Sequence, residues 1–244
     1  MIMDTAEELR SELRLLASSL ILHIEEGRES GGDLSFLKVA PPQMILKDTP
    51  RHIPVVDSSG ETGLTLGAVR KELGDCGRCP LARGRRNIVF GEGHEQAQLV
   101  FVGEAPGADE DMQGLPFVGR AGQLLTKIIV AMGLTRGDVY ICNLLKCRPP
   151  GNRNPKEEEI AACEPFLIKQ LAALRPKVIC TLGSFATNTL LRNEAPISVL
   201  RGHFHSYQGI KLMPTYHPAY LLRNPGAKKQ VWEDVQMIMG ELKG

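Results

Sequence analysis

The sequence lacks a long apolar run and a basic start. Its apolar segment at residues 15–24 is shorter than the roughly 18 residues that a membrane-spanning helix needs. Acidic side chains precede that segment, namely Asp4, Glu7, Glu8 and Glu12, whereas a secretory signal begins with basic residues. We therefore expect no membrane span and a cytoplasmic protein, in which the six cysteines stay reduced and available to metals.

The chain also lacks a large net charge, which is +1 over 244 residues. Residues 1–75 carry 8 basic and 13 acidic side chains, whereas residues 76–244 carry 21 basic and 15 acidic ones. The second part has the charge to bind a polyanion, although an ordinary solvated surface would have a similar balance. Its basic residues near glycine-rich loops are Arg83, Arg85, Arg86, Lys146, Arg148, Arg153, Arg201 and Arg223.

Two regions differ in composition. Residues 4–26 have leucines and isoleucine at helical spacing and predict an amphipathic helix, which either docks on the core or binds a protein partner. Residues 27–63 are rich in Gly, Ser, Pro and Asp without periodicity. We predict an N-terminal helix and flexible linker over 1–63 and a compact domain over 64–244, with a monomer as the expected state.

The compact domain alternates strands with helices. Apolar runs predict strands at 97–102, 139–142, 177–182 and 210–213. Helices are expected at 65–73, 120–132, 155–174, 184–191 and 227–242, with Pro155 in the first turn of its helix. This order predicts an α/β protein, a three-layer α/β/α sandwich around a central, mainly parallel four-stranded sheet.

Polar residues follow each predicted strand. They are Gly103-Glu104, Asn143, Gly183-Ser184 and Tyr216-His217-Pro218. The carboxyl ends of parallel strands meet at one edge of a sheet, where ligands bind. Any one of these residues alone is more simply a cap or a buried polar group. All four sets together predict an active site.

The cysteines form two groups. Cys142 and Cys180 lie within apolar strands and are expected to be buried. The other four have the spacing C-x2-C-x67-C-x15-C and are Cys76, Cys79, Cys147 and Cys163. Zinc and iron–sulfur clusters both accept four thiolates, and the spacing does not choose between them. A zinc deaminase would need His-x-Glu before Pro-Cys-x2-Cys, which this chain lacks.

Several long motifs in order resemble the family 4 uracil-DNA glycosylases. They are GEAPGADED (103–111), GLPFVGRAGQLL (114–125), YICNLLKCRPPGNRNP (140–155), CEPFL (163–167) and PTYHPAYLLRNP (214–225). The resemblance runs from Cys76 to about Trp232 and implies the fold of that family. It also implies base excision repair, by hydrolysis of the N-glycosidic bond of deoxyuridine in DNA. A 4Fe-4S cluster on the four spaced cysteines is implied as well.

The resemblance also implies the roles of individual residues. The uracil pocket is expected to comprise Gly103, Glu104, Ala105, Phe117, Asn143 and His217. In it Phe117 would stack on the base, Asn143 would pair with uracil O4 and N3–H, and His217 would donate to O2. Glu110 is the expected water-activating residue, with Glu104 as the alternative. Contacts with DNA are expected from Ser184, Leu221, Leu222 and Arg223, the last three as a wedge.

One departure and two alternatives stay open from the sequence. The best-known uracil-DNA glycosylases have aspartate and tyrosine where this chain has Ala105 and Gly107. A glycosylase of this fold with another base preference would carry a histidine in a basic insertion, and residues 148–154 contain none. An inactive DNA-binding accessory of replication is disfavoured because Glu110, Asn143 and His217 are all present.

Overall fold

The computed structural model describes residues 64–244, so the predicted N-terminal helix and linker lie outside the described residues. The described chain builds one six-stranded sheet in the order β1-β3-β2-β4-β6-β5. The strands are β1 (Glu92–Gly93), β2 (Leu99–Gly103), β3 (Tyr140–Asn143), β4 (Val178–Leu182), β5 (His205–Tyr207) and β6 (Ile210–Thr215). The four predicted strands are β2, β3, β4 and β6, and they pair in parallel.

Two further strands, β1 and β5, close the sheet at its edges and pair antiparallel with β3 and β6. Neither strand was predicted from the sequence. They have two and three residues, which is too short for an alternating or continuous apolar pattern to be recognised. The sheet is therefore mixed, with a parallel centre and two short antiparallel edges.

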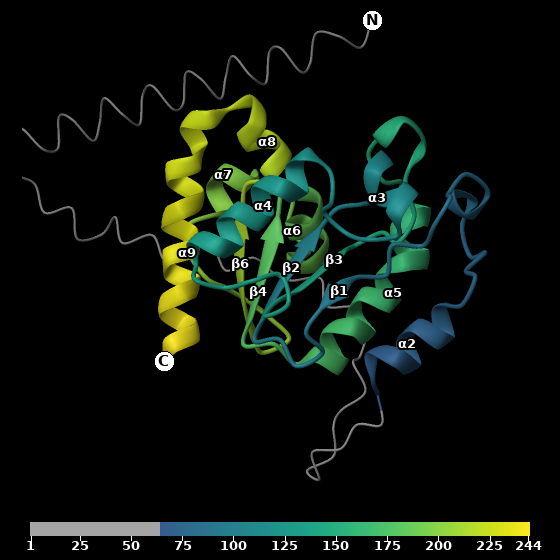
Figure 1. Ribbon diagram of the computed structural model, residues 1–244, viewed down its shortest axis with the longest axis horizontal. Helices are drawn as coiled ribbons and strands as arrows, with labels where there is room; N and C mark the ends of the chain where they lie inside the picture. Colours follow the sequence, from purple (N-terminus) through teal and green to yellow (C-terminus); the bar gives the residue numbers. More distant parts are fainter. Residues whose placement is uncertain (1–63) are drawn as a thin grey trace, which may run out of the picture. The chain divides into compact units, whose positions relative to one another are not determined.

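Helices cover both faces of the sheet (Figure 1). Helix α2 (Leu66–Leu73), α5 (Glu157–Leu174) and α6 (Ser184–Leu191) share one apolar cluster with Val100, Val102 and Ile179. Helix α4 (Arg120–Ala131), α8 (Pro218–Arg223) and α9 (Lys228–Lys243) share the other with Leu99, Phe101 and Cys180. Since neighbouring strand residues point to opposite faces, these two clusters confirm the predicted three-layer sandwich.

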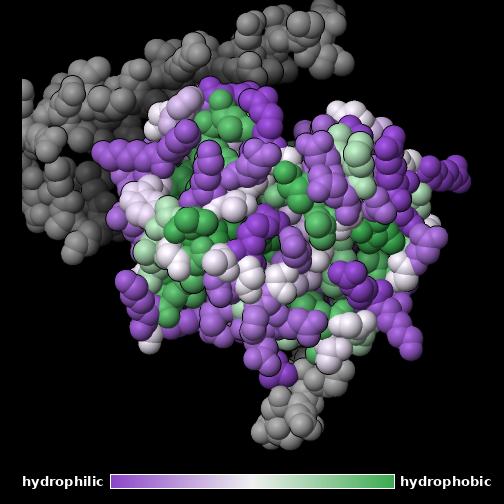
Figure 2. All heavy atoms as spheres, viewed as in Figure 1, coloured by the Kyte–Doolittle hydropathy of each residue, from purple (hydrophilic) through white to green (hydrophobic). Residues whose placement is uncertain are grey.

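The shorter elements lie in the loops. They are α3 (Ala108–Gln113), α7 (Ile197–Leu200) and the 3-10 turns η2 (Pro80–Arg83), η3 (Pro150–Asn152) and η4 (Pro225–Ala227). On the face shown in Figure 2, apolar surface is divided into separate patches among hydrophilic side chains. Within residues 64–244, no helix is both long and apolar enough to cross a membrane.

The start of α5 differs from the prediction. The sequence placed Pro155 in its first turn, but the helix begins at Glu157, after Lys156 as N-cap. The buried carboxylate of Glu159 explains this start, because it accepts hydrogen bonds from the Lys156 N–H at 2.9 Å and from Arg153 at 2.5 and 2.9 Å. These donors satisfy a capping geometry that begins two residues after the proline.

The parallel strands bring the predicted polar residues to one edge. In the register of β2 and β3, Gly103 lies opposite Asn143. The pairing continues past the strand ends, since Leu144 and Leu145 donate their N–H groups to the carbonyls of Gly103 and Glu104. Across the sheet, β4 and β6 end at Leu182 and Thr215, just before Gly183 and Tyr216. The edge is thus fixed by backbone pairing rather than by loops alone.

Candidate active site

A cleft of about 510 Å³ opens at this edge. Its lining includes all the predicted pocket residues except Gly103, namely Glu104, Ala105, Phe117, Asn143 and His217. The predicted water-activating residue Glu110 and the predicted DNA contact Arg223 line it as well. It also includes Pro149, Asn152, Arg153, Asn154 and Tyr220, which the sequence analysis did not assign to the pocket. Ser184 is exposed at the first position of α6 and does not line this cleft.

Asn143 lies at the bottom of the cleft with only 1% of its surface exposed. Its Oδ1 is the one buried side-chain oxygen or nitrogen among residues 64–244 that lacks a hydrogen-bond partner. Leaving a buried acceptor unpaired costs about 1–3 kcal/mol. Asn143 therefore presents an acceptor that a ligand N–H would satisfy.

Phe117 forms a wall beside this acceptor. A Cβ atom on Gly103 would lie 2.4 Å from Asn143 Oδ1 and 2.6 Å from Phe117 Cζ, so only glycine leaves room for both side chains. Phe117 itself has a φ of 53°, which is uncommon outside glycine. Backbone strain of this kind persists where surrounding contacts enforce it, often at functional sites.

Two charged side chains hold the strained turn at Phe117. Arg136 donates to the carbonyls of Pro116 and Phe117 at 2.7 and 3.1 Å. Glu110 accepts from the N–H groups of Val118 and Gly119 at 2.9 and 3.0 Å. It also accepts from Gly107 at 3.1 Å. The Glu110 carboxylate thus joins the start of α3 to the turn that presents the aromatic ring.

His217 lines the same cleft as the N-cap of α8. Its Nδ1 accepts the Ala219 N–H at 3.1 Å, so in the neutral ring the proton is on Nε2. Burial, and to a lesser extent the charge of Arg223, lower the pKa of His217 to about 4, against an opposing effect of Glu110. At neutral pH the ring is therefore uncharged, with one N–H free to donate.

The second glutamate, Glu104, differs from Glu110 in its surroundings. It is partly buried beside the cleft, and this burial raises the pKa of its carboxyl. Glu110 is already bound by three backbone donors, which leaves about one of the roughly four lone-pair positions of a carboxylate free. Both carboxylates line the cleft, so both remain candidates for activating water.

Comparison with known proteins identifies the family of this chain. The family model described as "Uracil DNA glycosylase superfamily" matches residues 90–236. The chain belongs to the uracil-DNA glycosylase superfamily.

Among curated relatives, the "Type-4 uracil-DNA glycosylase" of Saccharolobus solfataricus is 44% identical over 182 residues, covering 71% of this chain and 84% of that protein. The type-4 protein of Thermotoga maritima is 44% identical over 179 residues, covering 72% and 93%. A "Type-5 uracil-DNA glycosylase" of Pyrobaculum aerophilum is 30% identical over 187 residues, covering 63% and 82%. The similarity confirms the predicted relationship to the type-4 group.

Within this superfamily, Gly107 stands where the best-known enzymes have tyrosine. A Cβ atom on Gly107 would lie 2.7 Å from Glu110 Oε2. The Glu110 carboxylate thus occupies the space in which a side chain at 107 would begin. Gly107 and Glu110 form a matched pair, and a larger residue at 107 would displace the carboxylate.

The predicted DNA wedge needs a correction at Leu221. The Leu221 side chain is only 1% exposed and packs in the apolar cluster that α4 and α9 share. It has no free surface for DNA, because α8 turns that side chain toward the core. On the same short helix, Tyr220 and Leu222 are 38% and 40% exposed, and Arg223 is exposed beside the cleft.

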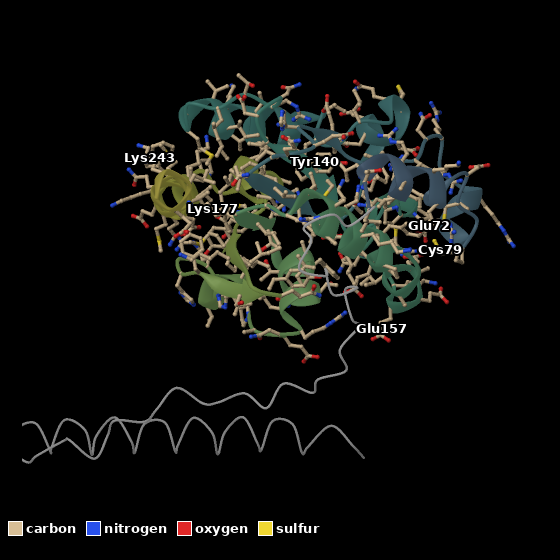
Figure 3. The ribbon with its side chains drawn as sticks, turned by 90° about the horizontal axis from the view of Figure 1, so that it is seen from below. Glu72, Cys79, Tyr140, Glu157, Lys177 and Lys243 are labelled. Atoms are coloured by element: carbon tan, nitrogen blue, oxygen red, sulfur yellow. The ribbon has the colours of Figure 1, made fainter. Side chains whose placement is uncertain are left out.

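The four spaced cysteines line one small cavity, together with Arg78, Arg85 and Lys146. They come from the segment after α2, the loop after β3 and α5; Figure 3 shows Cys79 on the side of the domain away from Lys243 of α9. Within residues 64–244, no three acidic, histidine or cysteine side chains converge on a single metal ion. A cluster spreads its thiolates over several irons, so convergence on one point is not required.

Hydrogen-bond donors point at three of these four sulfurs. The Lys146 N–H lies 3.2 Å from Cys163 Sγ, Arg78 Nη1 lies 3.3 Å from Cys76 Sγ, and Arg85 Nη1 lies 3.5 Å from Cys147 Sγ. Burial raises the pKa of Cys163 to about 11, so the free thiol is protonated and a bound metal must displace its proton. Donors aimed at sulfur suit anionic thiolates, and the residues therefore fit a thiolate-ligated cluster.

Proposed function

We propose that this chain hydrolyses the N-glycosidic bond of deoxyuridine in DNA, releasing uracil and leaving an abasic site. The observation that carries the proposal is the buried, unpaired Oδ1 of Asn143 in the cleft. Uracil N3–H is a donor that would satisfy it, and the Asn143 amide N–H would then donate to O4. The names of the type-4 relatives support the same activity.

In this proposal the base leaves its stack and enters the cleft beside Phe117. Stacking on an aromatic ring contributes about 1–3 kcal/mol per base. As the bond from N1 to C1′ breaks, its electron pair moves onto the uracil ring. Negative charge therefore develops at N1 and O2. Donation from His217 Nε2–H to O2 would stabilise this charge, by the logic of an oxyanion hole. Loss of one such donor costs about 3–4 kcal/mol.

Water supplies the hydroxyl group that bonds to C1′. Its proton passes to Glu110, which acts as general base, with Glu104 as the alternative, and the departing uracil anion takes up a proton from solvent. Three backbone donors fix the orientation of the Glu110 carboxylate. Its one free lone-pair position can therefore bind water in a defined direction. The methyl side chain of Ala105 has no group that could activate water.

DNA contacts are proposed for the rim of the cleft. Arg223 and Leu222 would enter the gap left by the flipped base, with Tyr220 beside them. Ser184 would contact a phosphate from the first position of α6, next to Gly183, which lies against His217. The net positive charge of residues 76–244 favours binding of the DNA phosphate backbone.

We propose that Cys76, Cys79, Cys147 and Cys163 hold a 4Fe-4S cluster. When bound, it would crosslink the segment after α2 to the loop after β3 and to α5, a structural role that requires no redox step. The shared cavity and the donors at three sulfurs support this set.

We further propose a cytoplasmic monomer with 64–244 as its catalytic domain and residues 1–63 as a helix and linker for a protein partner.

The proposed activity is tested with two end-labelled DNA strands that differ only in uracil or thymine at one position. The full-length chain should convert the uracil strand, and not the thymine strand, to an alkali-labile product. Uracil should appear in equal amount as the free base. Absence of both products with anaerobically prepared, iron-containing protein would refute the proposal.

A further inference from the structure

Lys146 is a fully buried amine that the proposed chemistry leaves without a role. Only 1% of its surface is exposed, and no carboxylate lies within ion-pair distance of it in the part of the chain that the structure describes. Buried lysines are rare unless they are paired, so a specific contact is expected to retain it. Its Nζ donates to Asn143 O at 2.6 Å and to Gln170 Oε1 at 2.5 Å. A charged or a neutral amine can make both bonds.

The bond to Asn143 fills a gap at the sheet edge. Strand β1 pairs with β3 only at Tyr140 and Ile141, so no strand lies beside Asn143 on that side. Leu144 donates its N–H toward β2, to Gly103 O. In a strand, the N–H and carbonyl groups of successive residues point to opposite sides. The Asn143 carbonyl therefore points away from β2, to the open side. There the Lys146 amine replaces the missing strand as donor.

Gln170 anchors the amine from α5. Its side chain is fully buried, and its Nε2 donates to Phe90 O at 2.9 Å. The main chain of Lys146 is fixed as well, since its carbonyl accepts from Val89 at 2.8 Å and its N–H donates to Cys163 Sγ at 3.2 Å. These bonds connect Lys146 to α5 and to the segment at 89–90, and its amine connects them to Asn143, the residue whose amide faces the cleft.

We propose that Lys146 is a positioning residue for base recognition. Its amine holds the main chain of Asn143 so that Oδ1 faces the base, and its own backbone N–H ties this segment to Cys163 of α5. The proposal rests on the proposed function, in which Asn143 pairs with uracil. An amide must be held firmly to distinguish uracil from cytosine, since its O and NH2 ends are nearly isosteric.

The test compares Lys146→Met, the double variant Lys146→Met with Gln170→Leu, and Asn143→Ala. Tyr140→Phe is the matched control, because it removes a buried hydroxyl that Gln170 contacts at 3.4 Å without touching Lys146. For each variant we would measure iron per chain, the thermal midpoint, single-turnover uracil excision, inhibition by free uracil and affinity for abasic DNA.

Lys146→Met should keep its iron and its abasic-DNA affinity while excision slows by about 100-fold, the effect typical of a misplaced reacting group. Inhibition by free uracil should weaken in parallel. The double variant removes the unpaired Gln170 Oε1 but also the donor to Phe90 O, so its thermal midpoint should stay near that of Lys146→Met, and its rate should not recover. Tyr140→Phe should excise at the wild-type rate.

Three results would overturn the inference: wild-type excision by Lys146→Met, recovery of the rate together with stability in the double variant, or loss of iron from Lys146→Met. Asn143→Ala separates this failure from that of the proposed function. If Asn143→Ala excises uracil normally, the assignment of base recognition to Asn143 is wrong. If it is inactive while Lys146→Met is normal, only the positioning role fails.

Discussion

The rings of Phe117 and His217 lie 5.6 Å apart between centroids, with 34° between their planes. These residues come from segments one hundred positions apart, and they border the same cleft as the buried amide of Asn143. The site thus combines an aromatic face, an unpaired acceptor and an imidazole donor. A flat heterocycle with alternating donors and acceptors is the ligand that uses all three.

The first prediction concerns pH. Because the pKa of His217 is lowered to about 4, the excision rate should show no acid limb near 6.5, the ordinary value for histidine. The rate should instead fall only as the pH approaches 4 to 5. Single-turnover rates on uracil-containing DNA between pH 4.5 and 8 measure this. A limb near 6.5 that disappears in His217→Asn would contradict the proposed neutral donor.

The same shift predicts a change in stability. The unfolded histidine binds a proton below about 6.5, whereas the folded one does so only below about 4. The contribution of His217 to stability is therefore complete above 6.5 and is lost as the pH falls from 6.5 toward 4. Denaturant unfolding of wild type and His217→Asn should show a difference that depends on pH in this window. A constant difference would count against the shift.

Glu110→Gln tests water activation. The amide replaces one carboxylate oxygen with an NH2 group, which faces backbone donors instead of accepting from them. We expect a fall in kcat of at least about 100-fold with little change in affinity for abasic DNA, because a general base acts in the transition state. Glu104→Gln is the matched comparison. If Glu104→Gln is inactive and Glu110→Gln is normal, the two roles are exchanged.

The metal prediction separates the two groups of cysteines. Protein purified without oxygen should be brown, with about four irons per chain. Cys76→Ser should lower the iron content. Cys180→Ser should not, because Cys180 is fully buried within β4 and does not line the cavity. Stoichiometric zinc without iron would refute the cluster.

Deletion of residues 1–63 tests the proposed domain boundary. Every proposed site residue and cysteine lies within 64–244, so the truncated chain should retain excision activity near that of the full chain. Its thermal midpoint should be measured alongside, to exclude unfolding. A folded but inactive truncation would assign the N-terminal residues to the site.

The central strands and the residues that follow them could be predicted from sequence. Continuous apolar runs such as 99–102 form buried parallel strands, and polar residues at their ends reach one edge by topology alone. Leu221 shows the limit. Its neighbours at 220 and 222 are exposed whereas Leu221 is buried, which depends on how α8 packs on α4 and α9. A helix of six residues is too short to show a periodic pattern of apolar residues.

The residues that hold the site in place could not be predicted from the sequence either. Lys146 and Arg136 are charged residues of the kind usually found on a surface, yet one is buried and the other holds the turn at Phe117. Their roles depend on contacts with residues far along the chain, such as Gln170. Local patterns identify groups that present chemistry, whereas tertiary packing selects those that hold them in place.

Asn143→Asp tests the central claim most directly. The carboxylate cannot donate to uracil O4, and a mismatched buried pairing costs about 1–3 kcal/mol or more. It can, however, accept from cytosine N4 and, when protonated, donate to N3. We would measure excision on matched strands that carry either uracil or cytosine at one position. The account predicts a large loss of uracil excision and a slight gain of cytosine excision. Uracil excision at the wild-type rate by Asn143→Asp would show that Asn143 does not recognise the base.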